Sequence, residues 1–460
     1  MDDSIGFSGV IRISNASDYI APSAACVIPV RTSTVSDEGD LVGRHAKKEG
    51  QKPVKVSISL ADCLACAGCV TSAETVLIEE QNLQAALRGL RDSAISVVSV
   101  SPASLASIAA HRKCSLKEAA QRITLYFISN GASLVIDANL GQTIALEEFW
   151  NEVDEMRKRT GKALPLLVSA CPGFVCYAEK SHGDLLLPLM SRVKSSQGVL
   201  GVLVKEFLPR FLNFNGEQGG AKSVFHVSVQ PCFDRKLEAS RPENSTGDNQ
   251  HVDCVLGTAE LNDALDSLSE EEMEESRGRE EERERRMGRV PRELTGFMRG
   301  ELFGIAGNVS GGYVDYCIER WSGTVAGEVR VETTKPSSNL EVCRASSASA
   351  EKKPFVAARL YGFRNIQNLV RKLKTKKEVE YDVIEVMACP AGCASGGGQV
   401  RSATNTERMK VNEEIEQLYR SIAVGTVSDT VRAFQGETKR DRLLMQLRDV
   451  KAESRTSLAW

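Results

Sequence analysis

Short runs rich in valine and isoleucine alternate with helical segments through the middle of the chain. The runs at 94–100, 133–137, 164–169 and 224–229 have the length and β-branched content of buried strands, and 381–386 adds another late in the sequence. Segments with helical character lie between them at 116–129, 145–159 and 197–208, the last stopped by Pro209. This alternation predicts an α/β fold in which parallel sheets are covered by helices.

Size and composition narrow the class of protein. The chain has 460 residues, of which 42% are hydrophobic, enough to fill more than one core without disulfides. Its formal net charge of -3 gives no general attraction for nucleic acid or an anionic membrane. The N-terminus lacks the basic and apolar regions of a signal peptide, and no apolar stretch approaches the length of a membrane span. We therefore expect a soluble intracellular protein.

Cysteine is unusually abundant relative to histidine. The chain contains 13 cysteines and only 5 histidines, which favours all-thiolate metal chemistry over mixed Cys/His zinc sites. In a reducing compartment thiols stay free, so clustered cysteines indicate metal or redox sites before disulfides.

The first cysteine cluster is a C-x2-C-x2-C run at Cys63, Cys66 and Cys69. This spacing lets three thiolates turn inward from one loop onto an inorganic cube. A bacterial ferredoxin motif would place its next cysteine where Ala73 stands, so the fourth ligand must come from elsewhere, and Cys26 is the nearest candidate. Because no second pair of cysteines follows at zinc-knuckle spacing, a 4Fe-4S cluster is favoured over zinc and over structural cysteines.

A second set of cysteines is dispersed along the chain but shares one local pattern. Cys171, Cys232 and the pair Cys389 and Cys393 each follow a predicted strand, beside proline or glycine. The carboxyl ends of parallel strands form the rim where open α/β sheets build their sites, so one crevice could gather all four. Although a single buried cysteine is commonly a small hydrophobic residue, the shared pattern predicts a second cluster.

Three of these segments carry a family resemblance. Residues 170–174, 230–232 and 387–399 resemble, in order, the three signatures of the iron-only hydrogenase large domain. With the N-terminal cluster added, the whole chain resembles the eukaryotic hydrogenase-like branch, the NARF-like proteins of cytosolic iron–sulfur assembly. The resemblance implies two parallel-sheet lobes that enclose a 4Fe-4S cluster, an irregular N-terminal segment with another, and hence two 4Fe-4S clusters. The implied ligands are Cys171, Cys232, Cys389 and Cys393 for the enclosed cluster, and Cys26, Cys63, Cys66 and Cys69 for the N-terminal one.

Two positions depart from the hydrogenase signatures. Hydrogenases place a proton-relaying cysteine where this chain has Ala170, and a lysine that holds the di-iron ligands where it has Arg235. Alanine cannot carry a proton, so these departures argue against hydrogen chemistry. We expect a protein that is not an enzyme and has no catalytic residues. The alternatives are an iron-only hydrogenase or other redox enzyme, and a nuclear lamina-binding paralogue.

The resemblance also implies partners. A non-catalytic carrier and adaptor of this family would connect the cytosolic scaffold ATPases to a targeting complex, a WD40 propeller protein with its associated subunits. Family members and clients end in a docking tripeptide, of which Leu458 and Trp460 keep both apolar anchors while Ala459 departs in the middle. We expect no nucleic-acid or membrane partner and a cytoplasmic location, with the nucleus left open.

The chain divides into five parts along the sequence. One of them is set apart by charge, because residues 270–289 hold nine Glu and six Arg and so account for the whole net charge, which predicts an exposed helix or solvated insertion. The expected parts are an N-terminal cluster-binding segment at 1–85, a first α/β lobe at 86–262, the charged insertion at 263–292, a second lobe at 293–400 with a disordered loop near 333–353, and a helical C-terminal region with a partner-binding tail at 401–460.

Overall fold

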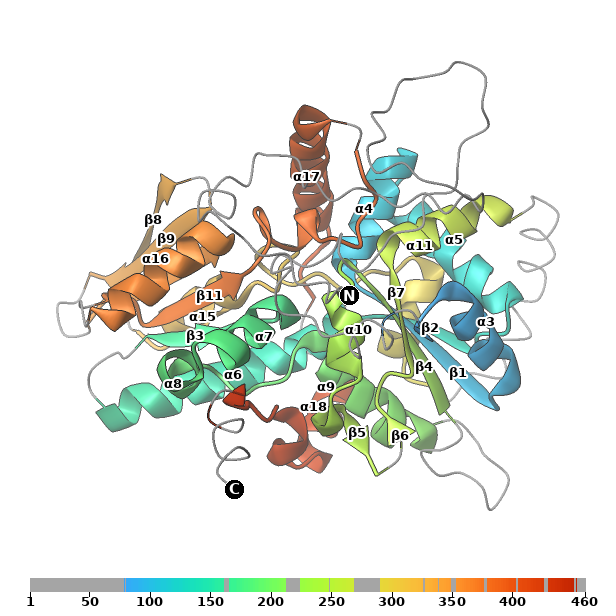
Figure 1. Cartoon of the computed structure of the whole chain (residues 1–460), viewed down its shortest axis with the longest axis horizontal. Helices are drawn as coiled ribbons and strands as arrows, with labels where there is room; N and C mark the ends of the chain where they lie inside the picture. The colour runs from blue at the N-terminus through green and yellow to red at the C-terminus, as the bar shows by residue number, and fades with distance from the viewer. Residues whose placement is uncertain are drawn as a thin grey trace, which may run out of the picture.

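Two lobes, each built on its own β-sheet, lie side by side in the structure (Figure 1). The computed structural model describes residues 78, 80–160, 165–211, 224–247, 249–268, 290–325, 327–337, 339–348, 353–375, 379–402, 404–425, 429–450 and 452. The N-terminal cluster segment up to residue 77, the Glu/Arg run and the last eight residues therefore lie outside the described part. Within that part, no helix is long and apolar enough to cross a membrane.

The first lobe contains a four-stranded, wholly parallel sheet in the order β2-β1-β4-β7. Every residue of the central strand β1 is buried, which explains why Ile and Val make up most of it. The strands are β1 (Ile95–Val100), β2 (Leu134–Asp137), β4 (Val224–Gln230) and β7 (Cys254–Gly257), with helices α3 (Leu83–Asp92), α4 (Pro102–Arg112), α5 (Leu116–Ser129) and α11 (Thr258–Ala264) around them. The predicted parallel sheet is confirmed here.

The second lobe contains a mixed sheet in the order β3-β11-β10-β9-β8. β3, β11 and β10 are parallel, whereas β9 and β8 run antiparallel at the outer edge. The strands are β3 (Leu166–Val168), β8 (Val329–Ser337), β9 (Leu340–Ser347), β10 (Phe355–Tyr361) and β11 (Val383–Met387), and the helices are α7 (Pro172–Ser181), α8 (Gly183–Leu186), α15 (Tyr313–Ser322) and α16 (Phe363–Lys374).

The prediction of a disordered loop near residues 333–353 is wrong over most of that range. β8 and β9 pair as an antiparallel hairpin, and residues 340–345 of β9 pair with β10. Cys343 and Ala345 of β9 are buried, while β8 lies at the exposed edge of the sheet. This segment is polar because it forms a hairpin at the edge of the sheet with one side exposed to solvent. A solvent-exposed loop has a similar composition, so composition alone does not distinguish the two.

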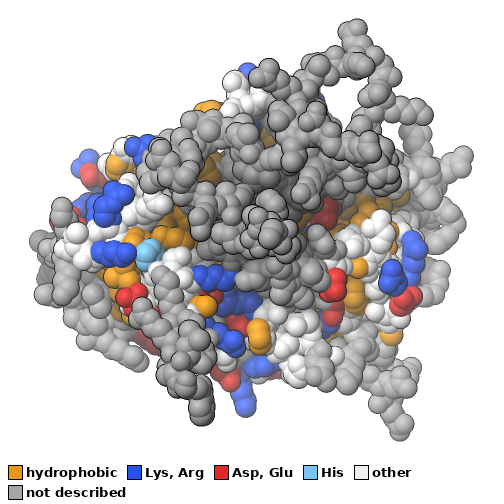
Figure 2. Space-filling view, viewed as in Figure 1, with side chains coloured by type: hydrophobic (Ala, Val, Ile, Leu, Met, Phe, Trp, Pro, Cys, Tyr) orange, Lys and Arg blue, Asp and Glu red, His pale blue; other side chains and the backbone are white. Residues whose placement is uncertain are grey.

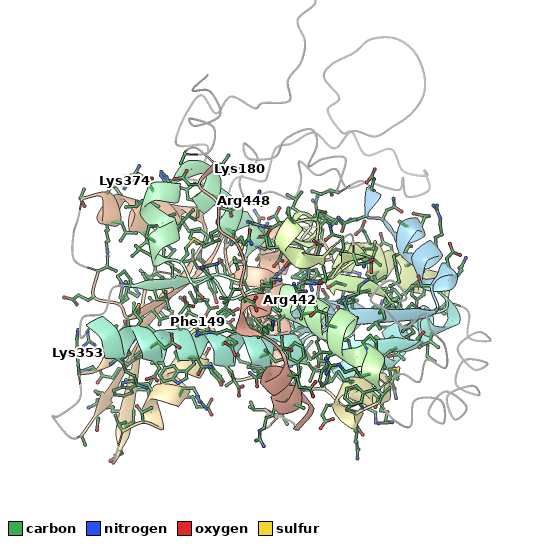
Figure 3. All side chains as sticks on the ribbon, turned by 90° about the horizontal axis from the view of Figure 1, so that it is seen from below. Phe149, Lys180, Lys353, Lys374, Arg442 and Arg448 are labelled. Atoms are coloured by element: carbon green, nitrogen blue, oxygen red, sulfur yellow. The ribbon has the colours of Figure 1, made fainter. Side chains whose placement is uncertain are left out.

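The two lobes are not consecutive pieces of the chain. β3 and α7 belong to the second lobe although they fall within 86–262, the range expected for the first. The long helix α6 (Asn139–Thr160) connects the lobes and runs through the molecule (Figure 3). Near its start Asn139 bonds to the Phe303 carbonyl, and near its end Arg157 pairs with Asp382 beside β11.

Most predicted elements appear with small shifts at their ends. Helix α5 begins at a capping box formed by Ser115 and Glu118. The helix expected at 197–208 is α9 (Ser196–Val202), followed by a π turn at Leu203–Phe207 and a short 3-10 turn containing Pro209. The remaining elements are α10 (Asp234–Ala239), the β5 (Ser245–Thr246) and β6 (Asn249–Gln250) pair, α14 (Arg292–Thr295), α17 (Asn405–Arg420) and α18 (Asp429–Glu437).

Candidate metal centre

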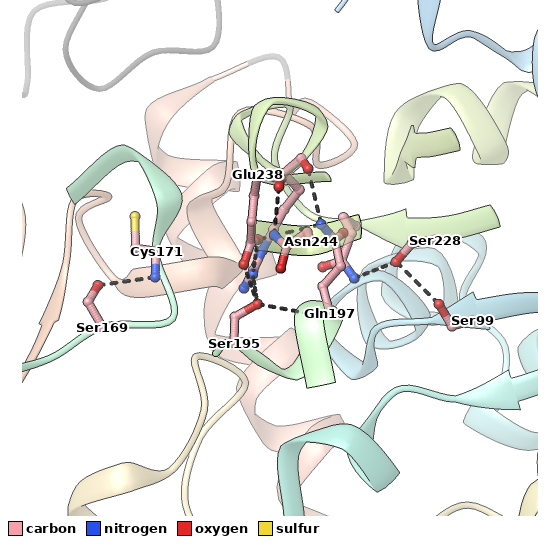
Figure 4. Close-up of polar contacts among 11 residues, drawn as sticks. Ser99, Ser169, Cys171, Ser195, Gln197, Ser228, Glu238 and Asn244 are labelled. Atoms are coloured by element: carbon pink, nitrogen blue, oxygen red, sulfur yellow. Dashed lines mark hydrogen bonds and ion pairs between the residues drawn. The ribbon is translucent and has the colours of Figure 1, made fainter. Parts of the chain in front are cut away.

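Cys171 lies directly beyond the end of β3 and caps the N-terminus of α7. Its backbone N–H donates to Ser169 Oγ at 3.1 Å (Figure 4), and Ser169 Oγ in turn donates to the Val386 carbonyl of β11 at 2.6 Å. The N–H of Ala388 also reaches the Cys171 thiol, so the ends of β3 and β11 are held together there. A thiol at the start of a ten-residue helix is well placed to ionise when a cation arrives.

Cys232 follows β4 and comes just before α10 in the first lobe. The loop of the second lobe that follows Cys393 lies tightly against it, and the Gly398 N–H donates to the Pro231 carbonyl at 2.9 Å. A Cβ atom at Gly398 would stand 3.2 Å from the Cys232 Cα, and one at Gly396 only 2.3 Å from the Pro231 carbonyl oxygen. These glycines allow the two lobes to meet at the cysteines.

Cys389 and Cys393 stand at the two ends of a tight turn that follows β11. Ala391 and Gly392 both adopt left-handed backbone conformations, with φ of 58° and 67°, and the Gly392 N–H closes the turn on the Cys389 carbonyl at 3.1 Å. The Cys393 N–H donates to Ser310 Oγ at 3.0 Å. A left-handed alanine is unfavourable in isolation, so the surrounding contacts hold this turn in place.

Arg235 is the cation that lies among these thiols. It is 4% exposed, and its charge interacts with Cys232, Cys393 and Cys171. Its Nη1 donates to Ser195 Oγ at 2.7 Å and to Glu238 Oε2 at 2.5 Å. Cysteines of both lobes therefore lie close enough to Arg235 for its charge to act on their thiols.

Without metal, the half-buried Cys171 and Cys393 thiols favour their protonated form. Burial raises the pKa of Cys393 to about 12, with Arg235 acting in the opposite direction and Cys171 adding to the rise. Burial likewise raises the pKa of Cys171. A metal centre must therefore supply the positive charge that ionises these thiols, which makes its uptake release protons.

The donor set consists of thiols. None of the nine cysteines that the structure describes forms a disulfide. Within the described residues, no three His, Cys, Asp or Glu side chains close around a single metal ion. A four-iron cube takes one thiolate on each iron, so its ligands stand farther apart than those of one zinc ion. The four cysteines follow the ends of β3, β4 and β11, and an all-thiol donor set of this kind fits an iron–sulfur cluster.

A small pocket beside the cysteines is lined by both positions at which this chain departs from the hydrogenase signatures. Ala170, Arg235 and Cys393 line it together with polar groups such as Gln142 and Ser310. Ala170 is buried and contributes only its methyl group. No side chain at position 170 can therefore pass a proton to this pocket.

Several residues around the cysteines were not predicted from the sequence. Ser169, Ser195 and Ser310 position the thiols or Arg235, but no spacing pattern distinguishes them from other serines. Glu238 stands three residues after Arg235 in α10, a helical ion-pair spacing that could have indicated the contact. Asp234 is buried with Oδ1 unpaired, and burial raises its pKa to about 7.

The other predicted site residues cannot be placed. Cys26, Cys63, Cys66 and Cys69 lie in the N-terminal part, and Leu458 and Trp460 in the C-terminal part, beyond the residues that the structure describes.

Comparison with known proteins agrees with the geometry. Residues 94–397 match the family described as "Iron only hydrogenase large subunit, C-terminal domain". The chain belongs to this iron-only hydrogenase-like family. A probable cytosolic Fe-S cluster assembly factor of Brugia malayi is 42% identical over 418 residues, which cover 90% of this chain and 88% of that protein. A cytosolic Fe-S cluster assembly factor of Xenopus tropicalis is 36% identical over 455 residues, covering 90% and 92%.

Solved structures support the fold of this family member. An apo FeFe-hydrogenase from Chlamydomonas reinhardtii superposes with a TM-score of 0.61 and 22% sequence identity, over 80% of this chain and 98% of that chain. The expected hydrogenase-like α/β architecture is confirmed, except that the sheet of the second lobe is mixed and not wholly parallel. The family model and the relatives confirm the family resemblance.

Proposed function

We propose that this protein is a non-catalytic iron–sulfur protein of cytosolic iron–sulfur cluster assembly. The names of its relatives support this role. The observation that carries it is the buried Arg235, whose charge acts on the Cys171, Cys232 and Cys393 thiols and which lines a pocket together with Ala170. This arrangement retains the means to hold a cluster and lacks a proton relay.

We assign two 4Fe-4S clusters to the chain. When bound, such a cluster stores electrons and can itself serve as the unit handed to an apoprotein. Cys171, Cys232, Cys389 and Cys393 would hold the second cluster, enclosed between the lobes and mainly structural. Cys26, Cys63, Cys66 and Cys69 would hold the first, in the segment that precedes the lobes, and we propose this one for transfer.

The polar residues around the four cysteines have proposed roles as well. Ser169 and Ser310 orient the loops that carry Cys171 and Cys393. Arg235 opposes the negative charge that four thiolates bring into a buried site. Because Ser195 and Glu238 already bind its guanidinium, Arg235 is committed to the protein's own side chains.

The proposed partners are the cytosolic scaffold ATPases and a WD40 propeller protein with associated targeting subunits, with Leu458 and Trp460 as the docking anchors. Pull-down with the propeller protein before and after removal of Trp460 tests this tail. We expect the shortened protein to lose most binding, whereas undiminished binding would exclude the tail as the anchor.

Iron counting tests the cluster assignment. Anaerobically prepared wild type should contain about eight iron atoms and as many acid-labile sulfides per chain, because each cube holds four. Cys63→Ala and Cys389→Ala should each lose roughly half, with a different EPR signal remaining in each variant. Wild-type iron near four per chain would overturn the two-cluster assignment.

Hydrogen uptake tests the absence of catalysis. A fully loaded sample given hydrogen and a viologen dye should leave the dye oxidised. Measurable dye reduction would support the hydrogenase alternative and contradict the role given to Ala170.

A further inference from the structure

Near its C-terminus the chain forms an extended strap, residues 443–449, across the junction of the two lobes. Lys194 N–H donates to the Leu443 carbonyl at 2.8 Å, and the Met445 N–H donates to the Arg192 carbonyl at 2.7 Å. In Figure 3 the chain passes from Arg442, in the middle of the molecule, to Arg448 near Lys180 of α7. The strap is thus a hydrogen-bonded part of the fold.

The strap binds to a partly buried ion pair between α7 and the segment after α10. Arg241 Nη2 donates to Glu179 Oε1 at 2.5 Å and to the Gln446 carbonyl at 3.3 Å. The same Glu179 oxygen accepts the Arg448 N–H at 3.0 Å. The Glu179 side chain is only 8% exposed, so its charge depends on these donors. Figure 2 shows basic and acidic side chains gathered near the lower centre of this face, where α7 and α10 lie in Figure 1.

The two helices that the strap joins both begin at proposed cluster ligands. Cys171 is the N-cap of α7, which carries Glu179. Cys232 comes two residues before α10, and Arg241 stands two residues after that helix ends. The Glu179–Arg241 pair therefore ties together two helices whose opposite ends hold Cys171 and Cys232.

The strap also covers the surroundings of Cys171. Met445 lines a pocket together with Ala170 and Pro172, the two neighbours of Cys171 in sequence, and with Ser195 and Glu238, which bind Arg235. Met445 and Leu447 pack against the apolar core of the second lobe. A change in the strap would therefore disturb both the neighbours of Cys171 and the residues that bind Arg235.

We propose that the strap and the Glu179–Arg241 pair are positioning elements that hold Cys171 and Cys232 at the separation that the second cluster requires. This inference rests on the proposed four-cysteine site. Since coupling between two binding equilibria is reciprocal, the closed strap strengthens cluster binding, and the cluster in turn favours the closed strap. The C-terminal region thereby reports whether the interlobe site is loaded.

The first test measures iron release. Full-length protein carrying Cys63→Ala, which leaves only the second cluster, is loaded anaerobically and given excess bathophenanthroline. Arg241→Gln should release iron about tenfold faster, because a loss of affinity of that size lies within the usual range of coupling and appears mainly in the dissociation rate. The matched control is Arg157→Gln, because Arg157 pairs with a similarly buried carboxylate, Asp382, away from the strap. Equal release rates in Arg241→Gln and the Cys63→Ala parent would overturn the proposal.

The second test needs no strap variant. Amide hydrogen exchange is compared between fully loaded protein and the Cys171→Ala/Cys232→Ala protein, which lacks only the second cluster. The amides of Met445 and Arg448 should exchange at least tenfold faster without the cluster, while amides of β1 change little. Unchanged exchange at Met445 and Arg448 would overturn the inference. A Cys63→Ala protein that binds no iron would instead contradict the proposed four-cysteine site itself, so the two failures are distinguishable.

Discussion

At the scale of single residues, a buried ion pair and close-approach glycines determine the candidate site. The Arg235 and Glu238 side chains are 5% and 12% exposed and satisfy each other together with Ser195. Breaking a buried pair by removing one partner leaves an uncompensated charge, whereas replacing both by apolar groups removes two charges at once. The loops at the cysteines also approach so closely that Gly396 and Gly398 have no room for side chains.

Replacing Arg235 alone should be more harmful than replacing the pair. We expect Arg235→Met to lower the free energy of unfolding by about 3–5 kcal/mol, because Glu238 loses its cation inside the protein. The double variant Arg235→Met/Glu238→Met should recover a large part of that loss. Urea titration of wild type, both single variants and the double variant completes the cycle. A double variant as unstable as the sum of the singles would show that the two charges do not interact.

Adding one methyl group at Gly396 should disrupt the centre. Its Cβ would overlap the Pro231 carbonyl oxygen, so Gly396→Ala must push the loop away from Cys232. We expect about four iron atoms per chain to be lost, measured by iron content and EPR. The control is Gly436→Ala in α18, where nothing lies within 4 Å of an added Cβ. Full iron content in Gly396→Ala would contradict the role of this close approach.

At the scale of elements, a buried histidine in the first sheet makes the free energy of unfolding depend on pH. His226 of β4 is fully buried, with Nε2 2.9 Å from Ser99 Oγ of β1 and Nδ1 2.9 Å from the His251 carbonyl. Burial lowers the pKa of His226 to about 3, so the folded protein keeps this ring neutral. The unfolded chain takes up the proton near pH 6.5, so this group destabilises the fold progressively as the pH falls below 6.5.

The pH dependence can be isolated with one substitution. Between pH 6.5 and 5.5, wild type should lose about 1 kcal/mol more of its free energy of unfolding than His226→Gln, because only the wild type takes up this proton on unfolding. Urea titrations of both proteins at the two pH values give the loss of unfolding free energy in each. The contributions of the other titrating groups cancel when the two losses are subtracted. Equal losses in the two proteins would mean that His226 is already charged in the fold.

At the scale of the whole molecule, the proposed centre lies where two separately built sheets meet. Cys232 comes from the first lobe and Cys171, Cys389 and Cys393 from the second, so cluster binding would link the lobes. The helix α6 and the strap cross the same junction by other routes. Metal loading and the stability of the lobe arrangement should therefore be coupled.

Losing a ligand from either lobe should have the same consequence. Cys232→Ala and Cys389→Ala should each lose the second cluster and lower the apparent melting temperature by a similar amount, and the double variant should fall no further. This lack of additivity is expected because each change removes the same interaction. Thermal unfolding of anaerobic samples measures it. Additive losses would indicate that the two cysteines act as separate packing residues.

The sequence alone determined the local elements, the family and the cysteine pattern. Its β-branched runs predict β1 and β4 because buried parallel strands need apolar side chains on both faces. The four dispersed cysteines could be grouped because parallel strands end on one rim, which limits where their loops go.

Only the tertiary structure decided how distant segments meet. β3 joins the second sheet, β8 and β9 pair as a hairpin, Ser195 binds Arg235, and residues 443–449 extend across α7 and α10. None of these has a local signal, because a polar or short segment acquires its place from partners far along the chain. Periodicity and spacing report on neighbours in sequence, whereas pairing across the lobes depends on burial and hydrogen bonds that exist only after the chain has folded.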